Sequence, residues 1–126
     1  MAHPVDELLE KWNDALRRSD ADALVALVTD DCEFWSPGQP PMVGRAALRD
    51  SFVEAFKKYN VEQLWEERER IAAGDFVMLR GIEKNIITPK KGIGESVVQQ
   101  RVFTIARRDA DGAWRFARGI TQFLAP

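Results

Sequence analysis

The hydrophobic pattern of this chain changes its period near Tyr59, and this change restricts the fold more than any other feature. Before Tyr59, apolar residues recur at helical spacing, as along the stripe from Val5 to Leu16. After it, apolar and polar residues alternate over long segments rich in Val, Ile, Phe and Trp, which is typical of strands. The sequence therefore predicts an α+β layout in which helices come first and a β-meander follows.

Three helices and five strands are expected. The first helix carries the stripe just described, and the second is a short helix for which Ser19 and Asp20 are the candidate caps, with Leu27 and Val28 among its inward residues. The third runs from Gly44 to about Tyr59. The predicted strands are Cys32–Ser36, Val61–Ala72, Phe76–Thr88, Gly94–Arg107 and Ala113–Phe123. Apolar helix faces packed on a strongly twisted sheet leave a hollow on its concave side, where small ligands usually bind.

Composition and charge exclude several classes of partner. The chain has 126 residues with 18 basic and 20 acidic side chains in mixed order, so neither nucleic acid nor a membrane is an expected partner. It has one cysteine, Cys32, and one histidine, His3, so we expect no disulfide, no metal site and no cofactor. Without a leader or a long apolar run, the sequence predicts a cytoplasmic protein with a single domain over residues 1–126.

Five strings of the sequence resemble a known family. They are Trp12, Asp20–Leu24, Asp30–Phe34, Pro37–Arg45 and Arg108–Trp114. With the order of elements, they make the chain similar to the nuclear transport factor 2-like superfamily, especially its SnoaL-like and ketosteroid isomerase-like branches. The resemblance covers nearly the whole chain and implies a cone-like, cystatin-like roll, with three N-terminal helices on a strongly curved, mainly antiparallel sheet around a pocket. It also implies a homodimer formed through the outer face of the sheet.

The catalytic pattern of the isomerase branch is altered at all three positions that the resemblance identifies. Its hydrogen-bonding tyrosine matches Trp12, its basic aspartate matches Ser36, and its second carboxylic acid matches Thr104. An indole N–H exchanges no proton, and a serine hydroxyl without an activating neighbour is a weak base. The histidines of dehydratase and cyclase members and the Asp-Arg-Asp set of epoxide hydrolase members are not recognisable. The sequence therefore assigns no catalytic residue and disfavours a true ketosteroid-type isomerase.

The resemblance implies eight residues around the pocket, and Arg80 is the one whose role is most open. Arg80 would hold a ligand carboxylate or polarise a carbonyl. Alternatively, it would form an internal salt bridge with a glutamate on a neighbouring strand segment, namely Glu67, Glu69, Glu83 or Glu95. The side of the sheet on which Gln99, Gln100 and Arg101 lie is also open, because one bulge reverses strand parity. The eight expected pocket residues are Trp12, Phe34, Ser36, Met42, Phe56, Met78, Arg80 and Thr104.

The leading function hypothesis is a small-molecule pocket protein that binds an apolar or aromatic metabolite. Isomerase, lyase or hydrolase-type acid–base chemistry is the class of reaction that such a pocket would support. The alternative is a noncatalytic, dimerising accessory domain whose interior is a filled core.

Overall fold

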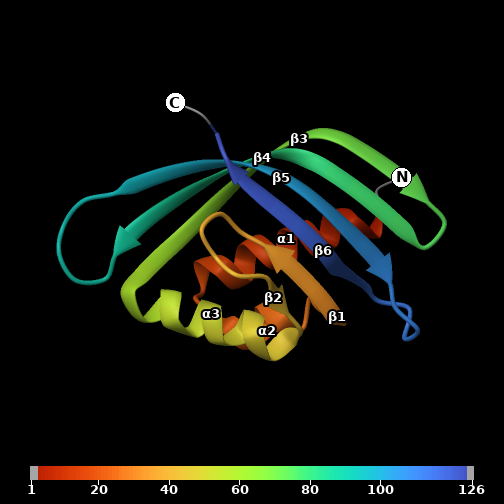
Figure 1. Cartoon of the computed structure of the whole chain (residues 1–126), viewed down its shortest axis with the longest axis horizontal. Coiled ribbons are helices and arrows are strands. Elements are labelled where there is room, and N and C mark those ends of the chain that lie inside the picture. Colours follow the sequence, from red (N-terminus) through yellow and green to blue (C-terminus); the bar gives the residue numbers. More distant parts are fainter. Residues whose placement is uncertain (1–2, 125–126) are drawn as a thin grey trace.

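The computed structural model describes residues 3–124, and within this range three helices lie on the concave side of a six-stranded sheet (Figure 1). The helices are α1 (Pro4–Arg17), α2 (Ala21–Val25) and α3 (Arg45–Lys58). The strands are β1 (Val28–Trp35), β2 (Met42–Val43), β3 (Tyr59–Ala73), β4 (Phe76–Pro89), β5 (Ser96–Arg108) and β6 (Trp114–Phe123). The predicted α+β fold, with helices packed on a curved, mainly antiparallel sheet, is confirmed.

The sheet has the strand order β2-β1-β6-β5-β4-β3, and its last four strands form the predicted meander. β1 lies beside β6 and is parallel to it, whereas β2 pairs antiparallel with β1 at the edge of the sheet. The sequence did not predict β2. It follows the proline-rich turn of residues 37–41, and its pairing of Met42 with Phe34 brings both side chains to the concave side of the sheet.

Local signals fix where the helices begin. The Val5 N–H donates a hydrogen bond to His3 Nδ1 (3.0 Å), so α1 has a side-chain N-cap. The Ala23 N–H donates one to Asp20 Oδ1 (2.9 Å), which caps α2 in the same way. α3 is preceded by Gly44 at φ 86°, a conformation that glycine adopts without strain. Within residues 3–124, no helix has the length and hydropathy that a membrane span requires.

The second helix is shorter than the sequence predicts. α2 ends at Val25, so the assignment of Leu27 and Val28 to this helix was wrong. Val28 begins β1, with its side chain fully buried, because the β-branched pair Val28 and Thr29 favours extended backbone. The Phe116 N–H also donates to the Leu27 carbonyl oxygen (2.9 Å), which ties this segment to β6.

The inner face of β4 is the reverse of the one that the sequence reading assigned. Val77 and Leu79 are fully buried against the helices, and Gly81 continues the same face. Met78 and Arg80 therefore lie on the outer face, and their predicted orientation toward the pocket was wrong. The cause is strand parity, because a shift of one residue exchanges the two faces of a strand.

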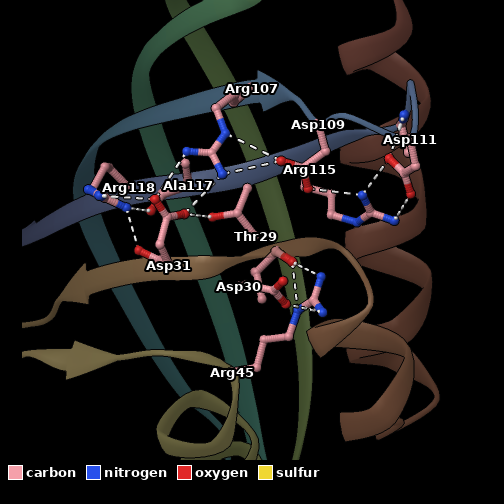
Figure 2. Close-up of polar contacts among 12 residues, drawn as sticks. Thr29, Asp30, Asp31, Arg45, Arg107, Asp109, Asp111, Arg115, Ala117 and Arg118 are labelled. Atoms are coloured by element: carbon pink, nitrogen blue, oxygen red, sulfur yellow. Dashed lines mark hydrogen bonds and ion pairs between the residues drawn. The ribbon is translucent and has the colours of Figure 1, made fainter.

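Arginine side chains fasten β1 to the sheet where its pairing with β6 is irregular (Figure 2). Arg118 Nη1 donates to the Asp31 and Ala117 carbonyl oxygens, both at 2.7 Å. The Asp31 carboxylate accepts hydrogen bonds from Arg107 (3.0 Å) and from Thr29 Oγ1 (2.7 Å). These contacts hold β1, and hence the cavity residues on it, against β5 and β6.

Candidate functional site

A cavity of about 580 Å³ lies between α1, α3 and the concave face of the sheet. Its size is that of a site for a metabolite-sized ligand. Most of its wall is apolar and much of it is aromatic. The apolar lining residues include Leu9, Trp12 and Leu16 of α1, Phe52, Ala55 and Phe56 of α3, and Phe34, Met42, Val61, Trp65, Ile87, Val102 and Phe116 of the strands or their ends.

Two of the aromatic walls pack over glycines on the sheet. A Cβ on Gly81 would lie 2.6 Å from a carbon of the Trp65 ring, and a Cβ on Gly119 would lie 2.8 Å from the Phe34 ring. Because glycine has no side chain, each ring can lie directly against the sheet. Gly81 and Gly119 thus set the positions of two cavity walls.

A polar strip crosses the apolar wall along neighbouring strands. It consists of Gln63 on β3, Glu83 and Asn85 on β4, and Gln100 on β5, all of which line the cavity. Gln63 pairs with Asn85 across β3 and β4, and Glu83 pairs with Gln100 across β4 and β5. Gln63 Nε2 donates to Asn85 Oδ1 (2.9 Å), and Asn85 Nδ2 donates to Glu83 Oε1 (3.3 Å). The amide groups therefore form a directed chain that ends on a carboxyl group.

Glu83 is the ionisable group that this strip presents to the cavity. Burial raises the pKa of its carboxyl group above the usual range, and the hydrogen bond from Asn85 offsets this only in part. The described residues form no ion pair with Glu83. A half-buried carboxyl group with a raised pKa is, when ionised, a stronger base than an exposed one.

Two further polar atoms of lining residues are buried without a partner. Within residues 3–124, Asn13 Oδ1 on α1 and Trp65 Nε1 on β3 have no hydrogen-bond partner. A buried polar group left unpaired costs about 1–3 kcal/mol. The cavity wall therefore contains an acceptor and a donor whose hydrogen-bonding capacity is unused.

The comparisons with known proteins show the family to which this chain belongs. A family model described as a SnoaL-like domain matches residues 9–117. The chain belongs to the SnoaL-like family. The resemblance to the SnoaL-like branch that the sequence indicated is thus confirmed. A search of curated proteins finds no match.

Solved structures share the fold of this SnoaL-like protein. A ketosteroid isomerase-like protein from Erwinia carotovora atroseptica is 24% identical, with a TM-score of 0.82 over 97% of this chain and 95% of that one. A nuclear transport factor 2-like superfamily protein from Salmonella enterica is 10% identical, with a TM-score of 0.84 over 97% and 89%. A nuclear transport factor 2-like protein with a cystatin-like fold from Novosphingobium aromaticivorans is 20% identical, with a TM-score of 0.77 over 96% and 80%. At these identities the likeness concerns the fold.

Six of the eight residues predicted for the pocket of this SnoaL-like chain do line the cavity. They are Trp12, Phe34, Ser36, Met42, Phe56 and Thr104. Trp12 packs edge-on against Phe52 and Phe116, with ring centroids 5.9 and 5.5 Å apart, so it also anchors α1 to its neighbours. Thr104 Oγ1 donates to the Arg118 carbonyl oxygen (2.7 Å), which leaves its hydroxyl able only to accept a further hydrogen bond.

Met78 and Arg80 are the two residues that the fold does not bring to the cavity. Arg80 lies at a second hollow, of about 350 Å³, on the outer face of the sheet. It pairs with Glu69 (3.2 Å), and its side chain is 56% exposed, so this is a surface ion pair. The predicted convergence of Arg80 with Trp12 and Ser36 on one enclosed space was therefore wrong, although a salt bridge to a glutamate was the other interpretation considered.

The sequence reading missed the polar strip. Glu83 was considered only as a partner for Arg80, and neither Gln63 nor Asn85 was singled out. Of the three residues left open on the next strand, Gln100 lines the cavity, whereas Gln99 and Arg101 are exposed. The signal was present in the alternation of Leu79, Gly81, Glu83 and Asn85, which places two polar side chains on the same face as buried ones.

Proposed function

We propose that this SnoaL-like protein binds a small, largely apolar molecule that contains an aromatic ring system and one polar group. The observation that carries the proposal is a cavity of about 580 Å³ whose wall is mainly aliphatic and aromatic and is crossed by a single polar strip. An apolar ligand body would gain free energy by leaving water, and a few well-placed polar groups would fix its orientation.

The cavity also weighs against an accessory domain with a filled core. Trp65 and Phe34 pack against glycines of the sheet, and between Phe52 and Phe56 the helix α3 presents the small side chain of Ala55 to the wall. A solid interior would bury larger side chains at these positions, since protein cores pack with few voids larger than water. We take the empty volume to be the functional feature of the fold.

A second candidate function is proton transfer on the bound molecule, which the raised pKa of Glu83 favours. Glu83 would act as the general acid or base in an isomerase, lyase or hydrolase-type reaction. Trp12, Ser36 and Thr104 replace the acid–base groups of the ketosteroid isomerase-like pattern. Such a reaction would therefore depend on β4, which carries Glu83, and not on α1, β1 and β5, which carry or precede those three positions.

We further propose that two copies of the chain associate through the outer face of the sheet. The exposed large apolar side chains on this face include Val97, Phe103 and Ile120, each between 43% and 49% accessible. Exposed apolar residues gathered on one sheet face favour burial against a partner, and an identical copy offers the same surface.

Binding is tested with Nile red, a neutral aromatic dye whose fluorescence rises in apolar surroundings. The wild-type protein is expected to bind it saturably, one dye per chain. Ala55→Trp would place an indole inside the cavity and should abolish binding, whereas the control Ala47→Trp, on the exposed side of the same helix, should not. Equal binding by both variants, with thermal unfolding showing that both are folded, would refute a ligand site in this cavity.

A further inference from the structure

The charge of the cavity wall is entirely negative. Among the described residues that line it, only Glu10 and Glu83 are ionisable, and both are acidic. Glu10 is exposed on α1, and Glu83 is half-buried on β4. No lysine, arginine or histidine from α3, β1, β3, β5 or β6 is among the lining residues. An anionic ligand would meet only like charge in partly dehydrated surroundings, and that is costly.

The hydrogen bonds of the polar strip prepare Glu83 to act as an acceptor. Gln63 donates to Asn85, and Asn85 donates to one oxygen of the Glu83 carboxyl group. A carboxyl group that receives an N–H is favoured in its ionised form, which can only accept. The described residues give Glu83 this one hydrogen bond and no cation, so a ligand that carries a donor, and best a positive charge, would complete its coordination.

An aromatic residue is the cross-strand neighbour of Glu83. Trp65 is the cross-strand neighbour of Glu83 on β3, and its ring rests on Gly81, two residues before Glu83 on β4. The faces of indole and phenyl rings attract cations, and the effect grows when the cation is removed from water. A carboxylate with an indole on the neighbouring strand, in a cavity with a mainly apolar wall, is an arrangement that suits an organic cation.

We propose that the ligand of this cavity is an amine, protonated when bound, on an aromatic body, and that Glu83 receives its ammonium group. This inference rests on the proposed function, because it names the charge class of the molecule that the cavity holds. The aromatic body would lie among the rings of α1, α3 and the sheet, and the ammonium group would point to the polar strip.

The proposal has a definite pH dependence. Binding requires Glu83 to be ionised and the amine to be protonated, so the affinity should rise with pH through the raised pKa of Glu83 and fall again above the pKa of the amine. Glu10, on α1, is the other acidic side chain among the described lining residues, and because it is exposed, water and salt screen its charge. A neutral ligand held by a protonated Glu83 would show the opposite trend, with its affinity falling as the pH rises.

The test uses three indole compounds of nearly the same shape, namely the cation tryptamine, the neutral alcohol tryptophol and the anion indoleacetate. Isothermal titration calorimetry is run with the wild-type protein, with Glu83→Gln, and with Glu10→Gln as the matched control. We expect tryptamine to bind the wild-type protein at least about tenfold more tightly than tryptophol, since charge-assisted hydrogen bonds are the stronger ones. Glu83→Gln should remove this preference, and Glu10→Gln should largely keep it.

The outcomes distinguish a failure of the amine proposal from a failure of the proposed binding function. Tryptophol or indoleacetate binding as tightly as tryptamine, or a tryptamine affinity that falls as the pH rises from acid to neutral, would overturn the amine proposal and leave the binding function standing. Saturable Nile red binding without tryptamine binding would do the same. Failure of Nile red and of all three indoles to bind would overturn the proposed function itself. The wild-type pH profile decides the matter even if Glu83→Gln does not fold.

Discussion

Replacing Gly81 with alanine tests whether the cavity wall depends on the absence of one side chain. A Cβ at this position would lie 2.6 and 2.9 Å from two carbons of the Trp65 ring and would also collide with the Glu66 carbonyl oxygen. Two carbon atoms pack at about 3.5 Å, so the ring would have to move by about 0.9 Å. The carbonyl oxygen belongs to the backbone of β3 and has no rotamer to adopt, so the strands must separate locally.

The cost of this change follows from the nature of the colliding atoms. Overpacking of a well-packed site costs about 1–3 kcal/mol, and we expect about 2–3 kcal/mol for Gly81→Ala because backbone is involved. Gly119→Ala is the matched control, since its Cβ would meet the Phe34 side chain, 2.8 Å away. Its three nearest contacts are all side-chain atoms, so no backbone has to move. That variant should lose only about 1 kcal/mol.

Urea unfolding followed by circular dichroism measures both losses under the same conditions. The slope of the free energy against urea should stay unchanged, so that the midpoints report stability directly. Gly81→Ala should also weaken Nile red binding, because the displaced Trp65 ring enters the cavity. A Gly81→Ala protein as stable as the wild type, or one no less stable than Gly119→Ala, would refute the reasoning about this wall.

Two further predictions concern the charge network of β1 and the outer face of the sheet. The hydrogen bonds from Arg107 and Thr29 lower the pKa of Asp31 to about 2 in the folded protein, from about 3.9 in the unfolded chain. The ionised carboxylate therefore stabilises the fold at pH values above the unfolded pKa. This stabilisation is lost as the pH falls through the folded pKa. Because the Asp31 side chain is 56% exposed, Asp31→Asn should cost under about 1 kcal/mol at neutral pH and much less near pH 2, where about half of the folded carboxyl groups are protonated. An equal cost at both pH values in urea unfolding would contradict this. Phe103→Glu should weaken the proposed dimer at least about tenfold in sedimentation velocity, whereas Val43→Glu at the β2 edge should not. A dimer that survives Phe103→Glu would rule out the outer face as its interface.

The elements of this fold could largely be predicted from the sequence, because each has a local signal. The helical stripe from Val5 to Leu16, the β-branched strands after Tyr59 and the glycine-containing turns all act over a few residues. The exceptions are also local in origin. β2 has two residues, too few for a periodic pattern, and Val28 was assigned to a helix although its β-branched side chain favours the strand that it begins.

The candidate site was harder to predict, because alternation along a strand does not say which face is inside. On β4 the inner face carries Val77 and Leu79, but the outer face is also apolar at Phe76, Met78 and Ile82. Hydrophobicity alone therefore could not orient the strand, and this is why Met78 and Arg80 were placed inside. The correct orientation depends on packing against α1, which only the tertiary structure supplies.

The central claim is that a small aromatic molecule enters the cavity between α1, α3 and the sheet, and nuclear Overhauser effects to methyl groups test it most directly. With methyl-labelled protein and bound tryptamine, we expect contacts from the indole ring to methyl groups of Leu9, Ile87 and Val102, which line the cavity. Ile82 and Ile120, at the hollow on the outer face, should give none. Contacts to Ile82 and Ile120 alone would place the ligand outside and contradict the account.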